Sequence, residues 1–354
     1  MSTFDGNNFY FSGQGVVLIG ARDSSGKPAG LIPVGNVSAL KLGLAATTLE
    51  HKESQTGNRA TDLRLITELK SSLQMTIENF SSTGLANALT GGVTEVAAGN
   101  VTTGNETAKL YHGKVTPLKN INVSSLVVKR NGGTPQTLTA YTNDSTPYDY
   151  KVNEAAGSVM INDGSVTALA SLTTGNTITA PTSVTVGATT VLTWLATPPA
   201  SVLAVGVGGY ISITGLAGAD AALLNSKAHR VTAIDATAKT VTLATNTAGK
   251  TITIGTPVLC VDGDVLDFVY NYSAQNRVDA MTALAAEKYM RFEGLNTADG
   301  GNPVIVEVFR FIVDPLKELA LIGEGIGPFV LDGNVLSDPL QPTGSKFFKV
   351  TQLR

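Results

Sequence analysis

The segment from residue 37 to residue 80 constrains the fold most, because it predicts an unusually long β-hairpin. Two alternating apolar segments flank one polar, charge-rich loop. From residue 62 to residue 78 apolar and polar residues alternate with period two, as in a β-strand with one apolar face, and Ile66 is the main exception. The predicted apolar face comprises Leu63, Leu65, Leu69, Leu73, Met75 and Ile77.

A hairpin of this length cannot bury its apolar face within its own domain. At roughly 3.3 Å per residue, the strand over 62–78 would extend on the order of 55 Å, whereas an ordinary strand spans roughly 17–20 Å. An isolated two-stranded hairpin is at best marginally stable in water. We therefore expect neighbouring copies of the chain to cover this face, so the first inference is self-assembly.

Charged residues of both signs gather at the predicted tip of the hairpin. One interpretation is a solvated loop, since runs of charge are commonly exposed to water. The other is that these residues pair with complementary charges on a neighbouring subunit and fix its register. The residues concerned are Glu50, His51, Lys52, Glu53, Arg59 and Asp62.

The composition favours many strands joined by tight turns. Charged residues make up 15% of the chain, against about 25% in average globular proteins. The 37 glycines, with abundant Thr, Val and Ala, are typical of β-rich proteins. We therefore predict a mostly β fold.

The charge pattern and the amino end exclude several classes of protein. The net charge is −3 and no basic tract occurs, so the sequence lacks the electrostatic footprint of a nucleic-acid-binding module. The first 15 residues lack the positive head and apolar core of a secretory signal, and no apolar span of 18 residues occurs. We expect a soluble product of the cytoplasm that does not bind a membrane.

A compositional shift predicts a small all-β domain over residues 164–261, inserted into a discontinuous host domain formed by residues 1–163 and 262–354. The predicted insert holds only six charged residues, four basic and two acidic, and all 11 Phe lie outside it. The host then carries 21 basic and 26 acidic residues, a net charge of −5. We expect whatever surface the host encloses or faces to be acidic.

Short helices are expected at three places in the host. Ser81 or Ser82 can cap a helix that Gly91 ends, and this helix should pack on a sheet. The composition of residues 277–288 is helical, although its apolar spacing supports a helix only weakly. Asp314 followed by a proline can start a third helix.

Motifs for catalysis are weak in this sequence. His51, His112 and His229 are the three histidines, and none lies in an HxxxH or HExxH arrangement. The glycines at 13 and 15 precede a strand rather than a helix, and the glycine-rich segment 323–327 lacks the GKS or GKT ending of a phosphate loop. We expect no enzymatic activity and no cofactor.

Motifs for metal binding are equally weak. Asp262, Asp264 and Asp267 resemble the start of a calcium loop, but no Glu follows at the required spacing, so a turn between strands is the favoured interpretation. The single cysteine, Cys260, lies in an apolar run and is interpreted as a core residue. We expect no bound metal.

Several segments of the predicted host resemble the major tail tube protein of long-tailed bacteriophages. They are residues 17–23 (VLIGARD), 35–37, 48–54 with 62–64, 277–279, 292–297 (FEGLNT) and 338–353. The resemblance implies a β-sandwich or barrel-like subunit with a flanking short helix and a long hairpin. Such subunits assemble into hexameric rings that stack into a hollow tube, with residues 50–62 as the hairpin tip.

The resemblance also implies partners and a location. DNA passes through the lumen of such a tube during ejection without specific binding, along a smooth negative wall. The partners are further copies of the chain and other tail proteins, such as the tape measure, the tail terminator and the baseplate or tip. The protein would belong to the virion tail and be assembled in the host cytoplasm.

The chain departs from this family pattern at the predicted insert. Residues 202–253 are similar to small β modules that recur in phage structural proteins. Because an insert in the channel would block passage, we expect it to project from the tube exterior. Two alternatives stay open: a capsid decoration or head-completion protein, or binding to a host surface through the insert, where Trp194 and Tyr210 are the available aromatic residues.

Overall fold

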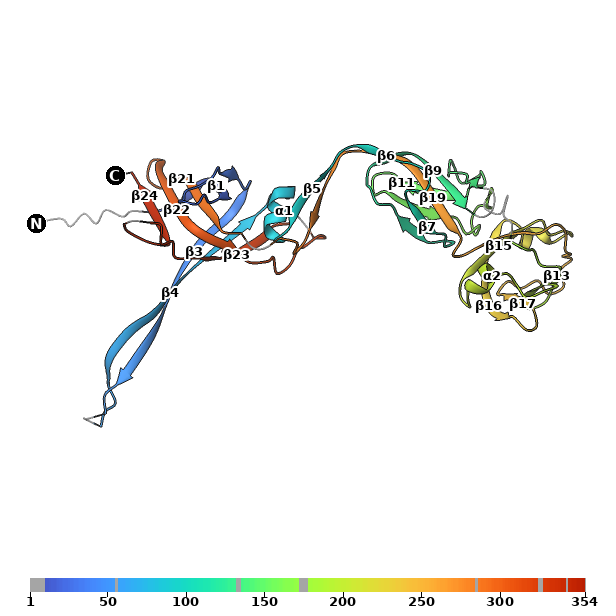
Figure 1. The fold of residues 1–354 in the computed structure, drawn as a ribbon, viewed down its shortest axis with the longest axis horizontal. Helices are drawn as coiled ribbons and strands as arrows, with labels where there is room; N and C mark the ends of the chain where they lie inside the picture. The colour runs from blue at the N-terminus through green and yellow to red at the C-terminus, as the bar shows by residue number, and fades with distance from the viewer. Residues whose placement is uncertain are drawn as a thin grey trace, which may run out of the picture. The chain divides into compact units, whose positions relative to one another are not determined.

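The described part of the chain is mostly β-strand, which confirms the predicted fold class (Figure 1). The computed structural model describes residues 10–54, 57–131, 135–171, 178–283, 286–323, 327–341 and 343–353. Within these ranges the helices are α1 (Ser82–Ala88), α2 (Ala200–Ala204) and one 3-10 turn, η1 (Ala221–Leu223).

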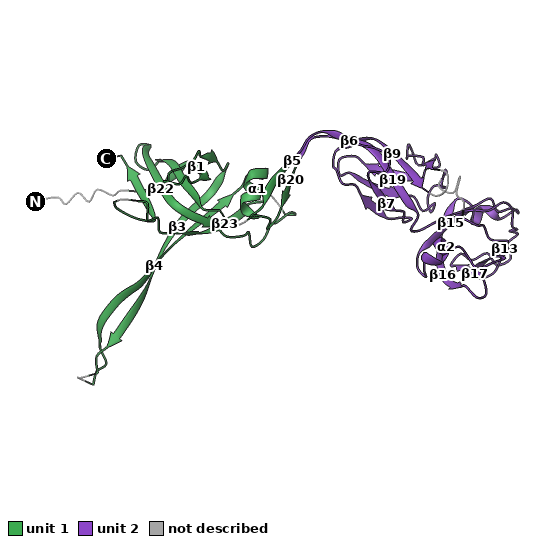
Figure 2. Ribbon diagram, in the orientation of Figure 1, with its two compact units in different colours: residues 1–95, 276–354 green, residues 96–275 purple. Residues whose placement is uncertain are grey.

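The chain divides into two compact units (Figure 2). Unit 1 comprises Met1–Glu95 and Asn276–Arg354, and unit 2 comprises Val96–Gln275. These boundaries differ from the predicted ones, because residues 96–163 and 262–275 belong to unit 2 rather than to the host. Unit 2 contains two separate cores, and the charge-poor segment 164–261 marks only the second of them.

Unit 1 is built on one curled, eight-stranded antiparallel sheet. Its strands lie in the order β2-β1-β21-β22-β23-β4-β3, and β24 pairs with β22. Their bounds are β1 (Gly13–Ala21), β2 (Ile32–Pro33), β3 (Val37–Lys52), β4 (Thr61–Ile77), β21 (Lys288–Asn296), β22 (Asn302–Val313), β23 (Phe329–Val335) and β24 (Phe348–Gln352).

The core of unit 1 lies on one face of this sheet. Its buried residues alternate along the strands, because successive side chains of a strand point to opposite faces. They include Val17, Ile19, Leu73, Met75, Ile77, Met290, Val308, Phe311, Val313, Phe329 and Leu331.

Helix α1 confirms the expectation of a capped helix packed on a sheet. The Ser81 hydroxyl accepts a hydrogen bond from the Gly84 amide at 3.1 Å, which satisfies one of the free donors of the first turn. Ala88, near the end of the helix, is fully buried and belongs to the core of unit 1.

The two other predicted helices are absent from the described residues. Strand β20 (Gln275–Asp279) begins before residue 277, and β21 starts at Lys288, so strands occupy both ends of the segment 277–288. The Asp314 amide donates to the Asp332 carbonyl and the Leu316 amide to the Ala88 carbonyl. Residues 314–323 form no helical turn, and these bonds tie the start of the segment to β23 and to α1.

A two-stranded ribbon marks the two places where the chain passes from one unit to the other. Strand β5 (Gly92–Val96) pairs with β20 there. The chain therefore leaves unit 1 and returns to it at two points that are neighbours in this ribbon.

The first core of unit 2 is enclosed by a five-stranded and a three-stranded sheet. The five-stranded sheet contains β6 (Gly99–Val101), β7 (Thr107–Lys109), β9 (Val123–Asn131), β10 (Gln136–Thr137) and β19 (Val265–Tyr272). The three-stranded sheet contains β8 (Val115–Pro117), β11 (Tyr150–Asn153) and β12 (Ser158–Ile161). Their core includes Leu110, Val128, Tyr150, Val159, Ile161 and Phe268.

The second core of unit 2 belongs to a six-stranded sheet with α2 and η1. Its strands are β13 (Ser183–Thr185), β14 (Thr190–Thr193), β15 (Tyr210–Thr214), β16 (Lys227–Asp235), β17 (Thr240–Leu243) and β18 (Val258–Val261). Trp194 is buried in this core, and its indole N–H donates to the Thr179 carbonyl at 2.8 Å. Tyr210 is half-buried on β15, so neither aromatic residue is an open platform for a ligand.

Candidate functional site

The hairpin of β3 and β4 extends beyond the core of unit 1 (Figure 1), as predicted. At its base, Leu73, Met75 and Ile77 are buried against neighbouring strands of the sheet. Beyond Ser71 the two strands pair only with each other, because the pairing between β23 and β4 ends there. Leu44 and Leu69, just past this point, are 72% and 60% exposed.

A β-bulge at Thr67 changes which side chains share a face of the hairpin. Glu68 pairs with Thr47, but the next pair joins Ile66 to Thr48, so Thr67 is an extra residue in β4. Its hydroxyl donates to the Thr47 carbonyl at 3.0 Å. Because an extra residue shifts the alternation by one, the odd-numbered apolar residues before it and those after it lie on opposite faces.

The bulge corrects the prediction of one continuous apolar face. Leu73, Met75 and Ile77 face the core of unit 1, and Leu69 continues their face outside it. Leu63 and Leu65 lie on the other face. Ile66, the exception in the sequence pattern, joins the face of Leu69 for the same reason.

The outer hairpin, defined as residues 44–54 and 57–70, therefore exposes apolar side chains on both faces. Six large apolar side chains are involved. By the pairing of β3 with β4, three of them lie on the face that continues the core of unit 1, and the other three lie on the opposite face. The first group is Leu44, Ile66 and Leu69, and the second is Leu49, Leu63 and Leu65. The sequence interpretation placed the apolar face only on residues 63–77, so it missed Leu44 and Leu49 of β3.

The charged residues of the predicted tip form pairs across the hairpin. The His51 ring nitrogen Nδ1 lies 2.7 Å from the Asp62 carboxylate, and Arg64 Nε lies 3.8 Å from the Glu50 carboxylate. Both pairs are exposed, so they contribute little to stability. The remaining predicted residues are exposed Lys52, partly exposed Glu53 and exposed Arg59.

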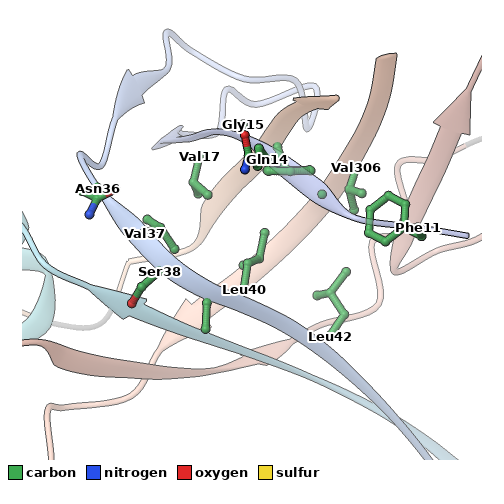
Figure 3. A pocket seen from close by; sticks show the side chains of 13 residues that line it. Phe11, Gln14, Gly15, Val17, Asn36, Val37, Ser38, Leu40, Leu42 and Val306 are labelled. Carbon is green, nitrogen blue, oxygen red and sulfur yellow. The ribbon is translucent and has the colours of Figure 1, made fainter. Parts of the chain in front are cut away.

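An apolar slot lies between the two end segments of the curled sheet (Figure 3). It has a volume of 550 Å³ and is lined by the start of β1, by residues 36–42 and by single residues of β21 and β22. Figure 3 shows side chains along this space from β1 and the residues just before it, from β3 and from β22, among them Phe11, Val17, Leu40, Leu42 and Val306.

The backbone along this slot keeps unpaired strand edges. Among the described strands β3 pairs only with β4, and β2 covers β1 only at Leu18 and Ile19. The Val17 carbonyl accepts from the Val34 amide, so the outer edges not paired with a described segment are those of residues 13–16 and 37–42. Such an edge can accept a further strand.

A second hollow of 630 Å³ lies where the outer hairpin leaves the sheet. Leu44, Leu69, Val335, Leu336 and Phe347 line it, with Glu68 and Lys70 beside them. Both hollows belong to unit 1, so this unit carries the apolar hairpin and two apolar recesses.

Unit 2 brings a serine, a histidine and an aspartate together in the order of a catalytic triad. His112 Nδ1 lies 2.8 Å from the Asp262 carboxylate, and His112 Nε2 lies 3.1 Å from the Ser212 hydroxyl. All three side chains are buried, and the Ser212 hydroxyl also donates to the Cys260 carbonyl at 3.3 Å. A nucleophile must reach its substrate, so this buried group is a joint between the two cores and not an open active site.

No local pattern in the sequence predicts this joint. His112 is 100 residues from Ser212 and 150 residues from Asp262. Sequence patterns detect neighbours along one element, whereas this contact depends on the packing of two modules.

The three aspartates of the calcium-like segment face different partners. Asp262 accepts from His112 and Tyr210, Asp264 lies 3.7 Å from Arg130, and Asp267 accepts from the Gly104 amide. Among the described residues, no group of three or more metal-ligating side chains could hold a metal ion.

The other candidates for reactivity are core residues. Burial raises the pKa of the Cys260 thiol well above its ordinary value, so the thiol stays protonated. Burial also disfavours the charged form of His229 and so lowers the pKa of this side chain. Its ring forms hydrogen bonds with the Thr245 hydroxyl and the Leu224 carbonyl. His229 is 5% exposed and is therefore a core residue.

The comparisons with known proteins return one family. A family model described as "Protein of unknown function UCP028589" matches residues 10–203 and 209–351, which spans both units. No curated protein matches the chain. Within the described residues, no helix has the length and apolar character needed to cross a membrane.

Proposed function

We propose that this chain, which belongs to the family UCP028589, is a structural subunit that polymerises through its long hairpin. The outer hairpin carries the argument, because it exposes six large apolar side chains on two unsupported strands. Complete burial of a fully exposed side chain of this kind contributes about 1.5–3 kcal/mol, and roughly half of that is still available here, because these residues are 48–72% exposed. In a monomer these side chains stay in contact with water, whereas a neighbouring copy of the chain can bury them.

The apolar slot supports the same proposal from the receiving side. A hairpin of one copy and a slot of the next are different surfaces, so their contact is heterologous and can generate rings or stacked tubes. Unpaired strand edges on both sides of the slot add backbone hydrogen bonds to the apolar contact.

The assembly that fits best is the tail tube of a long-tailed bacteriophage. The segments that resemble tail tube proteins belong to unit 1, which also carries the hairpin, the curled sheet and helix α1. We infer stacked hexameric rings with a lumen for DNA, and tape measure, terminator and tip proteins as partners in the virion. Unit 2 would project from the outside of the tube, because a second unit in the channel would block passage.

Truncation of the hairpin tests the proposal. Ala45 and Lys70 lie directly opposite each other, so a two-residue Asn-Gly turn can replace residues 46–69 without a change of register. We expect the truncated chain to stay folded and monomeric, while the full chain forms rings or tubes in negative-stain electron microscopy. Tubes from the truncated chain would contradict assembly through the hairpin.

The same micrographs separate the tube from the alternatives. Discrete oligomers of the full chain, with no stacking, would contradict a tube and favour a decoration or head-completion protein.

A further inference from the structure

The second hollow of unit 1 lies at the base of the outer hairpin, and we call it the base hollow. It adjoins the apolar slot, because the lining of the slot along β3 ends at Leu42 and the lining of the hollow begins at Gly43. A hairpin of another copy that lies along β3 can therefore reach both recesses.

The base hollow combines a buried floor with open walls. Val335 in its lining is 4% exposed, whereas Leu44 and Leu69 beside it are 72% and 60% exposed. Strand β23 stops pairing with β4 at Ser71, so no described strand pairs with this edge of β4 beyond that residue. The hollow of 630 Å³ is therefore an apolar recess open to side chains from outside the chain.

A second apolar group lies nearer the end of the hairpin and on its opposite face. We call its members, Leu49, Leu63 and Leu65, the tip leucines. Along β3, five residues separate Leu44 in the base hollow from Leu49, which is about 17 Å at roughly 3.3 Å per residue. The bulge at Thr67 thus gives one hairpin two apolar groups that differ both in face and in distance from the tip.

This offset favours a head-to-tail contact between copies. A two-fold contact joins like surfaces, so it would cover the tip leucines of both copies and leave both base hollows open. A contact between the tip leucines of one copy and the base hollow of the next covers both kinds of surface. Every copy that carries the hollow also carries the tip leucines, so no other protein is needed to fill it.

The size and the charges of the hairpin suit this contact. The outer hairpin has about 25 residues, and a stable protein interface uses roughly 20–30 residues a side. Glu68 lies 2.9 Å from Lys70 beside the base hollow, and Asp62 lies 2.7 Å from His51 beside the tip leucines. Because each of these carboxylates has a partner in its own hairpin, the contact does not bury an unpaired charge.

We propose that the tip leucines of one copy fill the base hollow of the next copy. The inference rests on assembly through the hairpin and adds the surface on which the hairpin docks. The docking surface comprises Leu44, Leu69, Val335, Leu336 and Phe347. The same contact recurs at every junction, so it can close a ring or continue as a stack.

Cross-linking between copies tests this contact. One variant carries Leu63→Cys at the tip and the other carries Leu336→Cys in the base hollow, and neither position is fully buried. An assembled mixture of the two, after mild oxidation or treatment with a short bismaleimide, should contain linked dimers with one copy of each variant. Each variant alone should give no dimers, because a tip thiol then faces a hollow without a thiol. Mass spectrometry identifies the linked residues, and the native Cys260 is buried.

A matched control changes the face of the hairpin and keeps the strand. Ile66→Cys is exposed on the face of β4 opposite Leu63, so its mixture with Leu336→Cys should give far fewer dimers. Equal cross-linking by Ile66→Cys, dimers of Leu63→Cys alone, or a lack of mixed dimers with both reagents would overturn the proposal. If mixed dimers are lacking while truncation of the hairpin still abolishes tubes, assembly through the hairpin stands and docking in the base hollow fails. If the full chain does not assemble at all, both fail.

Discussion

Leu69 and Leu73 lie on one face of β4, four residues apart, yet Leu69 is 60% exposed and Leu73 is 2% exposed. The boundary between them is Ser71, where β23 stops pairing with β4. One strand thus passes from the core of unit 1 into solvent without a change in its apolar character. We interpret the outer part as surface kept for a neighbouring copy.

Replacing either leucine by alanine should separate stability from assembly. Leu73→Ala leaves a cavity in a packed core and should lower the free energy of unfolding by about 2–5 kcal/mol. Leu69→Ala should change it by less than about 0.5 kcal/mol, because the side chain is exposed. Leu69→Ala should instead raise the concentration needed for assembly about tenfold, the equivalent of about 1.4 kcal/mol lost at the contact.

Chemical denaturation and light scattering measure these two effects. An unchanged assembly threshold in Leu69→Ala would contradict a role for this face. Ser72→Ala is a suitable control, since Ser72 lies on the same strand but on the opposite face.

The bulge at Thr67 makes a second prediction, about register. With the bulge, Leu49 lies opposite Leu65; without it, Leu49 would lie opposite Ile66. Directly opposed residues suit a disulfide, which needs a Cα separation of about 4.4–6.8 Å. The double variant Leu49→Cys with Leu65→Cys should therefore oxidise readily, and Leu49→Cys with Ile66→Cys should not.

Mass spectrometry under mild oxidation distinguishes the two pairs. The native Cys260 is buried, so it should not compete for the new thiols. Faster oxidation of the second pair would show that the hairpin has no bulge in solution.

The sequence was informative where a pattern is local and uninformative where contacts are distant. Period-two alternation was enough to predict the hairpin, and Ser81 was enough to predict the start of α1. The bulge was not predicted, because Thr67 is a common residue in strands. That Thr67 is an extra residue becomes clear only from the pairing, in which Glu68 lies opposite Thr47 and Ile66 lies opposite Thr48. For the same reason the alternation over 62–78 was interpreted as one face.

The division into units shows a different limit of sequence reasoning. Charge density changes at residue 164, but the ribbon of β5 and β20 separates the units at residues 95 and 276. The local composition reflects the environment of each residue, whereas the boundary between two units depends on which strands pair with each other. The joint of His112, Ser212 and Asp262 depends on such pairing as well.

The two units should unfold independently, which is a third prediction. Trp194 is the single tryptophan of the chain and is buried in the second core of unit 2. Leu73→Ala should therefore shift the circular dichroism transition of unit 1 and leave the midpoint of the tryptophan fluorescence unchanged. Val241→Ala, in the same core as Trp194, should shift the fluorescence midpoint instead. A shift of the fluorescence midpoint in Leu73→Ala would mean that the units unfold together.

The fourth prediction concerns the pH dependence of unit 1. A hydrogen bond from Arg310 lowers the pKa of Glu287 below its ordinary value of 4.5, against an opposing effect of burial, and the charges of Arg310 and Arg22 lower it further. Arg22 Nη1 lies 3.0 Å from this carboxylate. A carboxylate with a lowered pKa stabilises the fold fully above the unfolded pKa, and this contribution disappears as the pH falls through the lower pKa of the folded state.

Glu287→Gln should therefore lower the stability of unit 1 at pH 7, by less than about 1 kcal/mol because the carboxylate is partly exposed. The difference from the native chain should shrink as the pH falls below the unfolded pKa of about 4.5 and disappear below the lower pKa of Glu287 in the folded state. Urea unfolding followed by circular dichroism at several pH values measures it. Glu68→Gln is the matched control, since Glu68 pairs with Lys70 on the exposed hairpin. An equal loss of stability at pH 7 and pH 3 would show that the charge of Glu287 does not stabilise the fold.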